Sequence, residues 1–166
     1  MQYRLFACDY AEHVLTRERE LGYEPDPRSW QVVEEARKYA LGQTTPDALA
    51  AACDAASDAV VAASGVAVPA HVGYAAVAAL GCGAFGDDEF TAQYVCYFGL
   101  QAASDAAAVA AADSVDRSDY DADCAAAYAV LSAAVGTARE AALAAEHEWQ
   151  ERRFSFWTEQ IASVEQ

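Results

Sequence analysis

The stretch AVVAASGVAVPAHVGYAAVAALGCGAFG, residues 59–86, contains no charged side chain in a protein whose formal net charge is −16. Aspartates flank it at Asp58 and Asp87. About a quarter of the whole chain is alanine, well above average usage, and alanine has the highest helix propensity. Its small side chain also lets helix axes approach closely. These features predict tightly packed α-helices beneath a strongly anionic surface.

The length of 166 residues fits a single helical domain over residues 1–166 with one core. Strand signals are nearly absent, because no substantial region alternates β-branched or aromatic residues with polar ones. We therefore expect an all-α fold, a compact bundle of about six Ala-rich helices that ends in a long C-terminal helix.

Helix start and stop signals divide the chain into these segments. Gly22 and Gly42 can end the first two helices, and the pairs Asp26-Pro27 and Thr45-Pro46 can cap and begin the second and third. Asp87 is the expected N-cap of the fifth helix, after an interhelical turn over residues 81–86. The expected helices cover about residues 4–21, 27–41, 46–64, 69–80, 88–112 and 124–161, the last with a bend near Gly136.

The fourth expected helix, residues 69–80, is almost entirely small and apolar, which predicts that neighbours enclose it and that it is the central helix. Because alanine buries little apolar area, larger side chains must supply much of the hydrophobic stabilisation. We expect that contribution from the aromatic residues Trp30, Tyr74, Phe85, Tyr94, Tyr97, Phe98, Tyr128 and Trp149.

Residues 59–86 are also long enough to suggest a membrane span, since about 20 apolar residues can cross a bilayer. Glycines and Pro69 interrupt the stretch, and aspartates flank it where Lys or Arg would normally fix orientation. Two packed helices of a soluble protein are the favoured interpretation. Five scattered cysteines without a C-x-x-C pair, and a beginning unlike a signal peptide, favour a cytoplasmic location.

The balance of 10 Lys and Arg against 26 Asp and Glu makes binding to nucleic acid or an anionic membrane unfavourable, because phosphates would be repelled. A basic protein is the natural partner for such a surface. The alternative interpretation is that the acidity only maintains solubility.

Patterns that carry chemistry are weak throughout the chain. His13, His71 and His147 belong to no H-E-x-x-H or Glu-x-x-His motif, and Asp119 to Asp123 lack the glycine and glutamate of a calcium loop. The glycine pattern of residues 81–86 matches G-x-G-x-x-G but has no strand before it, so a turn is favoured over a phosphate site. We expect no metal, no cofactor and no enzymatic activity.

Three short segments occur in order along the chain: DYAEHVL at residues 9–15, DPR at 26–28 followed by EEARKYALG at 34–42, and EWQERRF at 148–154. The first resembles an A-E-x-V-L start, the second an acidic-proline turn before an E-A-A-R-x-W/Y-A-x-G helix, and the third a W-Q-x-x-R element. Together they resemble the all-helical immunity proteins that accompany bacterial polymorphic toxins.

That resemblance implies an immunity protein that binds a cognate toxin in the cytoplasm and neutralises it by occlusion, with a basic toxin as the expected partner. Alternatives are a small helical enzyme or a ligand or metal carrier with its site in the bundle, and an acidic inhibitor that mimics DNA. The candidate contact residues lie in two acidic runs: Asp87, Asp88, Glu89, Asp113, Asp116, Asp119, Asp121 and Asp123.

Overall fold

The computed structural model describes residues 2–64, 69–86, 88–114 and 124–164. Six α-helices and no strand occur in this part of the chain, which confirms the predicted all-α fold. The helices are α1 (Gln2–Glu20), α2 (Pro27–Ala40), α3 (Pro46–Ala63), α4 (Ala70–Ala84), α5 (Glu89–Ser114) and α6 (Cys124–Val164). The long C-terminal helix is confirmed as 41 residues that continue through Gly136 without interruption.

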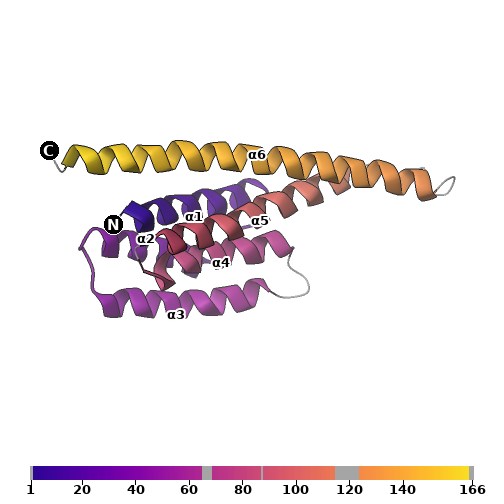
Figure 1. Ribbon diagram of the computed structural model, residues 1–166. Coiled ribbons are helices and arrows are strands. Elements are labelled where there is room, and N and C mark those ends of the chain that lie inside the picture. The colour runs from indigo at the N-terminus through magenta and orange to yellow at the C-terminus, as the bar shows by residue number, and fades with distance from the viewer. Residues whose placement is uncertain (1, 65–68, 87, 115–123, 165–166) are drawn as a thin grey trace.

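The helices form a layered bundle in which α6 and α3 lie on opposite sides (Figure 1). Between them, α4 contacts α1, α2, α3 and α5, so the helix predicted to be central lies in the interior. The N-terminal helix shares this position, because α1 contacts α2, α4, α5 and α6. The C-terminal half of α5 and the N-terminal half of α6 extend beyond the other helices (Figure 1).

The boundaries of the first three helices follow the local signals in the sequence. Asp26 caps α2 by accepting a hydrogen bond from the backbone N–H of Arg28 at 2.9 Å, and Thr45 caps α3 in the same manner. The Arg28 side chain also bonds this carboxylate and holds the pKa of Asp26 below its usual value. Gly22 and Gly42 follow α1 and α2 with φ of +90° and +69°, a conformation that glycine adopts without strain.

The turn predicted over residues 81–86 is wrong for its first four residues, which continue α4. The glycines are needed there for close packing and not for backbone freedom. A Cβ atom on Gly81 would lie 2.7 Å from the Tyr94 ring, and one on Gly83 would lie 2.8 Å from Val32 Cγ2. The helix ends at Ala84, and Gly81 and Gly83 let α5 and α2 approach it closely.

The uncharged stretch of residues 59–86 is divided between the end of α3 and α4, as the favoured interpretation predicted. Among the described residues, one helical segment, Glu89–Ala112 in α5, is long and apolar enough to cross a membrane by length and composition. Core helices of soluble proteins also meet these two criteria. The segment contains the polar residues Gln93, Gln101 and Asp105.

The large side chains of the core differ from those expected. The largest fully buried ones include Tyr10, Leu15 and Val32, and α1 supplies more of them than any other helix. Of the aromatic residues expected to stabilise the core, Tyr97 is 58% exposed. Trp30, Tyr74, Phe85, Tyr94, Phe98 and Trp149 are only partly buried, and the side chain of Tyr128 lies outside the described residues. Helical spacing showed which residues share a face but not which face meets solvent.

A buried carboxylate fastens α6 to the rest of the bundle. Asp9 of α1 is 6% exposed and accepts hydrogen bonds from Arg37 Nη1 of α2, Arg153 Nε of α6 and Trp157 Nε1 of α6, each at 2.6 Å. Burial alone would lower the pKa of Arg37, but Asp9 and Glu12 outweigh it and raise that pKa. We call Asp9, Arg37, Arg153 and Trp157 the Asp9 anchor, because these four side chains connect three helices.

The close approach of α1 and α5 predicts a large effect at Gly99. A Cβ atom there would lie closer than 3.0 Å to Tyr10 and Val14, which are both buried. Gly99→Ala should lower the free energy of unfolding by about 1–3 kcal/mol in urea titration. Gly136→Ala is the control: nothing lies within 4 Å of its Cβ position, so the gain in helix propensity should stabilise by about 0.5–1 kcal/mol. Equal effects at the two sites would contradict this packing.

The Asp9 anchor makes a second prediction. Asp9→Asn keeps the shape of the side chain but leaves two guanidinium groups without their shared anion, so unfolding should require about 2–4 kcal/mol less free energy. The exposed Asp47, which has no ion pair in the described part of the chain, provides the control Asp47→Asn, expected within about 0.5 kcal/mol of the parent. A neutral effect of Asp9→Asn would show that the anchor contributes nothing to docking α6.

Candidate functional site

Most of the acidic residues predicted to contact a partner lie where the structure gives no side chain. Asp87, Asp116, Asp119, Asp121 and Asp123 are outside the described residues. Asp113 lies near the end of α5, but its side chain is not among those described. Asp88 and Glu89 are described, and both are exposed.

Asp88 and Glu89 have roles at the start of α5. Asp88 Oδ1 accepts hydrogen bonds from the Thr91 backbone N–H at 3.0 Å and from Thr91 Oγ1 at 3.1 Å, so Asp88 is the N-cap where the sequence suggested Asp87. Glu89 Oε1 accepts a bond from Gln93 Nε2 at 2.9 Å. Neither carboxylate contacts a basic side chain in the described part of the chain, so both keep their charge at the surface.

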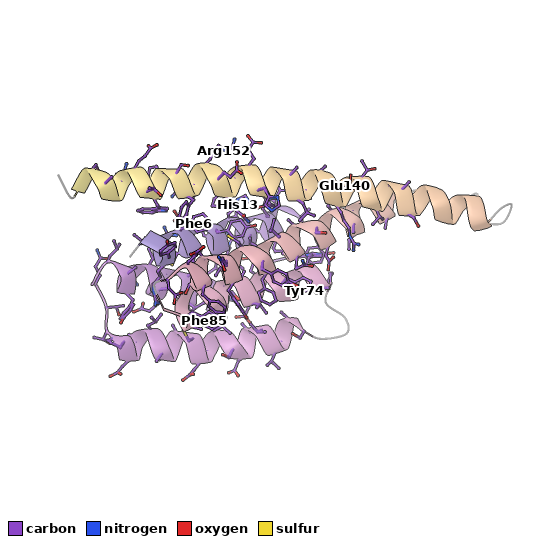
Figure 2. All side chains as sticks on the ribbon, viewed as in Figure 1. Phe6, His13, Tyr74, Phe85, Glu140 and Arg152 are labelled. Carbon is purple, nitrogen blue, oxygen red and sulfur yellow. The ribbon has the colours of Figure 1, made fainter. Side chains whose placement is uncertain are left out.

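An aromatic strip continues from these two carboxylates along α4 and α5. We use this name for the six residues Tyr74, Phe85, Phe90, Tyr94, Tyr97 and Phe98. Their rings contact one another in sequence, with centroids 5.3 Å apart for Phe90 and Phe85 and 4.7 Å apart for Phe85 and Tyr94. Tyr94 lies 4.7 Å from Phe98, which lies 6.2 Å from Tyr74. Figure 2 shows Phe85 and Tyr74 near opposite ends of α4.

Two rings of the aromatic strip face solvent. Phe90 is 56% exposed and Tyr97 is 58% exposed, while the other four are partly buried. Contiguous exposed aromatic surface is typical of binding sites, because large rigid rings supply much contact area at little entropic cost. The sequence analysis named five of these six residues but assigned them to the core.

The basic side chains are already engaged by partners within the chain. Of the ten Lys and Arg residues, Arg117 is outside the described part, and Arg4 donates to the carbonyl oxygens of Gly83 and Phe85. The remaining eight form ion pairs: Arg17–Glu20, Arg19–Glu24, Arg28–Asp26, Arg37–Asp9, Lys38–Glu34, Arg139–Asp105, Arg152–Glu148 and Arg153–Asp9.

Many carboxylates remain without such a partner. Within the described ranges, the exposed acidic residues that form no ion pair are Asp47, Asp54, Asp88, Glu89, Glu140, Glu151 and Glu159. They lie on α3, at the start of α5 and on α6, so negative charge covers both outer sides of the bundle. In the described part of the chain, these unpaired carboxylates give the surface a negative potential.

The three segments that carry the family resemblance meet in space around α1. Asp9 and Glu12 of the first segment bind Arg37 of the second. Tyr10 lies 5.3 Å, between ring centroids, from Trp149 of the third, and the Asp9 anchor includes Arg153 of the third. These residues hold α1, α2 and α6 together, so the segments form a structural framework.

A second candidate site is a pocket of about 290 Å³ between α1, α5 and α6. Alanines of α5 and α6 form one part of its wall, and its polar lining residues are His13, Arg17, Glu18, Glu146 and Arg152. His13 Nε2 lies 3.2 Å from both carboxylate oxygens of Glu146, and the imidazole stacks on Trp149 with ring centroids 4.4 Å apart. Figure 2 shows His13 between α1 and α6. Such a pocket can enclose a small ligand.

Two thiols, one near this pocket and one on α3, have a raised pKa. Burial, aided by Glu146, raises the pKa of the nearby Cys96 to about 12, and burial also raises the pKa of Cys53. Both thiols are therefore protonated and weakly nucleophilic at neutral pH. Within the described residues, no group of three or more His, Cys, Asp or Glu side chains could hold a metal ion.

His71 is buried inside the bundle, where its imidazole pairs with the buried carboxylate of Glu18. Its Nδ1 lies 2.6 Å from Glu18 Oε2, and these side chains are 1% and 2% exposed. The edge of the Tyr23 ring covers the imidazole at 4.9 Å between centroids. Sequence reasoning missed both His–Glu pairs because 53 and 133 residues separate the partners, and no local motif joins them.

The comparisons with known proteins do not identify a relative. No protein-family model matches the chain, and no match was found among curated proteins or solved structures.

Proposed function

We propose that this protein is an immunity protein, which binds a cognate bacterial toxin and neutralises it by covering the surface that the toxin needs for its own activity. The observation that carries the proposal is the distribution of charge. Eight basic side chains are held in ion pairs within the chain, while exposed carboxylates on both outer sides have no such partner.

This distribution suits recognition of a basic protein. A surface whose charges have one sign accelerates the encounter with a partner of opposite charge and repels partners of like charge. It disfavours nucleic acids and anionic lipid surfaces, because their phosphates add to the repulsion. A toxin that acts on nucleic acid has a basic surface of the required kind, and covering that surface would stop its activity.

The framework around α1 supports the same proposal in a different way. The three segments that resemble immunity proteins are used for packing helices together, so the resemblance concerns the scaffold and leaves the contact surface free to differ. A family of inhibitors that meets different toxins needs such a division between framework and surface.

No reaction is needed for this function. Binding is stoichiometric, the protein acts in the cytoplasm where the toxin would do harm, and it uses neither metal nor cofactor. The raised thiol pKa values and the enclosed His71 agree with a protein that works by binding.

The pocket beside His13 makes a ligand carrier the second candidate. Its volume of about 290 Å³ and its His–Glu pair would suit a small molecule with both apolar and polar groups. Native mass spectrometry of protein purified from the source organism distinguishes the two candidates. A carrier should retain a discrete small molecule, whereas an immunity protein should show only the mass of the polypeptide.

The proposal predicts rescue of growth and salt-sensitive binding. Co-expression with the product of the neighbouring toxin gene should restore growth of a cell that the toxin alone arrests. In stopped-flow measurements the association rate constant should fall at least tenfold between low salt and 0.5 M salt, because screening removes the steering, while dissociation changes little. Failure to rescue together with absence of a complex at low salt would remove the proposal.

A further inference from the structure

An open groove lies over α4. Both α3 and α5 pack against α4, but in the described part of the chain they do not contact each other. Figure 1 shows α4 between these two helices. The side of α4 that they leave uncovered includes Tyr74, Val77 and Leu80, which are partly buried. We call this feature, bounded by α3 and by the aromatic residues Phe90, Tyr94, Tyr97 and Phe98 of α5, the α4 groove.

Each end of the α4 groove is hollowed. Near the start of α4, a concavity of about 330 Å³ is lined by Tyr74, Val77 and Phe98 together with the end of α3. Near its end, a wider basin of about 630 Å³ is lined by residues that include Leu80, Phe85 and Asp54. The exposed rings of Phe90 and Tyr97 on α5 lie beside these hollows, because Phe90 contacts Phe85 and Tyr97 contacts Phe98. The surface therefore combines concave regions with protruding aromatic rings.

The floor of the α4 groove is uncharged and its margins are acidic. α4 contains no Asp, Glu, Lys or Arg, and its one histidine is buried against Glu18. Asp54 lines the wide basin, and Asp88 and Glu89 precede Phe90 at the start of the aromatic strip. The basin also contains the Arg4 guanidinium, which is buried and donates to the carbonyl oxygens at the end of α4. The exposed charge around the groove is therefore negative.

We infer that the α4 groove is the surface that binds the partner protein, and that the partner presents apolar side chains flanked by Lys or Arg. This inference rests on the proposed function and adds the location and the chemistry of the contact. Apolar side chains fill the two hollows and contact the rings, while the basic residues pair with the carboxylates at the margins. Central aromatic contacts with charges at the rim are the usual division of roles in protein interfaces.

The negative charge at the margins of the α4 groove determines which kind of partner can bind there. A second copy of this protein would bring the same carboxylates face to face, and an anionic membrane would place phosphates against them; both arrangements are repulsive. A basic protein converts the same groups into attractive contacts.

The experiment uses isothermal titration calorimetry to measure how full-length variants bind a purified toxin that is encoded by a gene adjacent to the gene for this protein. Phe90→Ala and Tyr97→Ala each remove an exposed ring and should raise the dissociation constant at least tenfold. Phe156→Ala is the matched control, because this ring on α6 is 40% exposed and lies outside the groove; its dissociation constant should stay within about twofold of the parent. Circular dichroism should show the same helicity for all variants. Glu89→Lys should slow association.

The outcomes separate the inference from the proposed function. If the parent binds and the two groove variants bind equally well, the inference is wrong and the proposed function stands. If the parent does not bind the toxin at all, the proposed function is wrong and the inference fails with it. Self-association in analytical ultracentrifugation that Tyr97→Ala abolishes would assign the groove to a second copy, and binding to anionic vesicles that it abolishes would assign the groove to a membrane; either overturns the inference.

Discussion

The bundle depends on one buried carboxylate. Alanine-rich helices approach closely but bury little apolar area, so α6 needs attachments stronger than methyl contacts. Asp9 provides them by accepting bonds from Arg37, Arg153 and Trp157, which draws α1, α2 and α6 to one point. The cost of removing Asp9 from water is offset because charged and neutral donors satisfy both of its oxygens. The Asp9 anchor therefore adds an ion pair and a hydrogen bond to the packing of α6 against α5.

Local signals predicted the helices well. The cap-and-proline pairs at Asp26 and Thr45 and the glycines at 22 and 42 placed the early boundaries within a residue or two, because these effects act within one helical turn. The glycines of residues 81–86 misled the analysis. Whether a glycine permits a turn or a close helix contact depends on a neighbour such as Tyr94 or Val32, and sequence alone does not bring that neighbour into place.

The site was less predictable than the fold. Two of the acidic residues suggested from sequence, Asp88 and Glu89, lie beside the α4 groove, but five of the six residues of the aromatic strip next to them were expected in the core. Helical periodicity at Phe90, Tyr94 and Phe98 marks one face of α5 as apolar, yet it does not tell a face that meets another helix from one that awaits a partner. The His–Glu pairs could not be predicted from local patterns, because each pair joins two helices that are far apart in the sequence.

The Asp9 anchor and the α4 groove have different locations: the anchor joins α6 to α1 and α2, whereas the hollows of the groove are lined mainly by residues of α3 and α4. The helices α6 and α3 lie on opposite sides of the bundle (Figure 1). Substitutions in the groove therefore leave the carboxylate and its donors untouched. Because of this separation, the same fold can bind new partners when a few exposed aromatic and acidic residues are substituted. Antibody loops vary on a constant framework in the same way. In lineages that share this scaffold, sequence divergence should accordingly concentrate at the outward residues that line the α4 groove, whereas residues 9–15 of α1 and the closely packed glycines of α4 should persist.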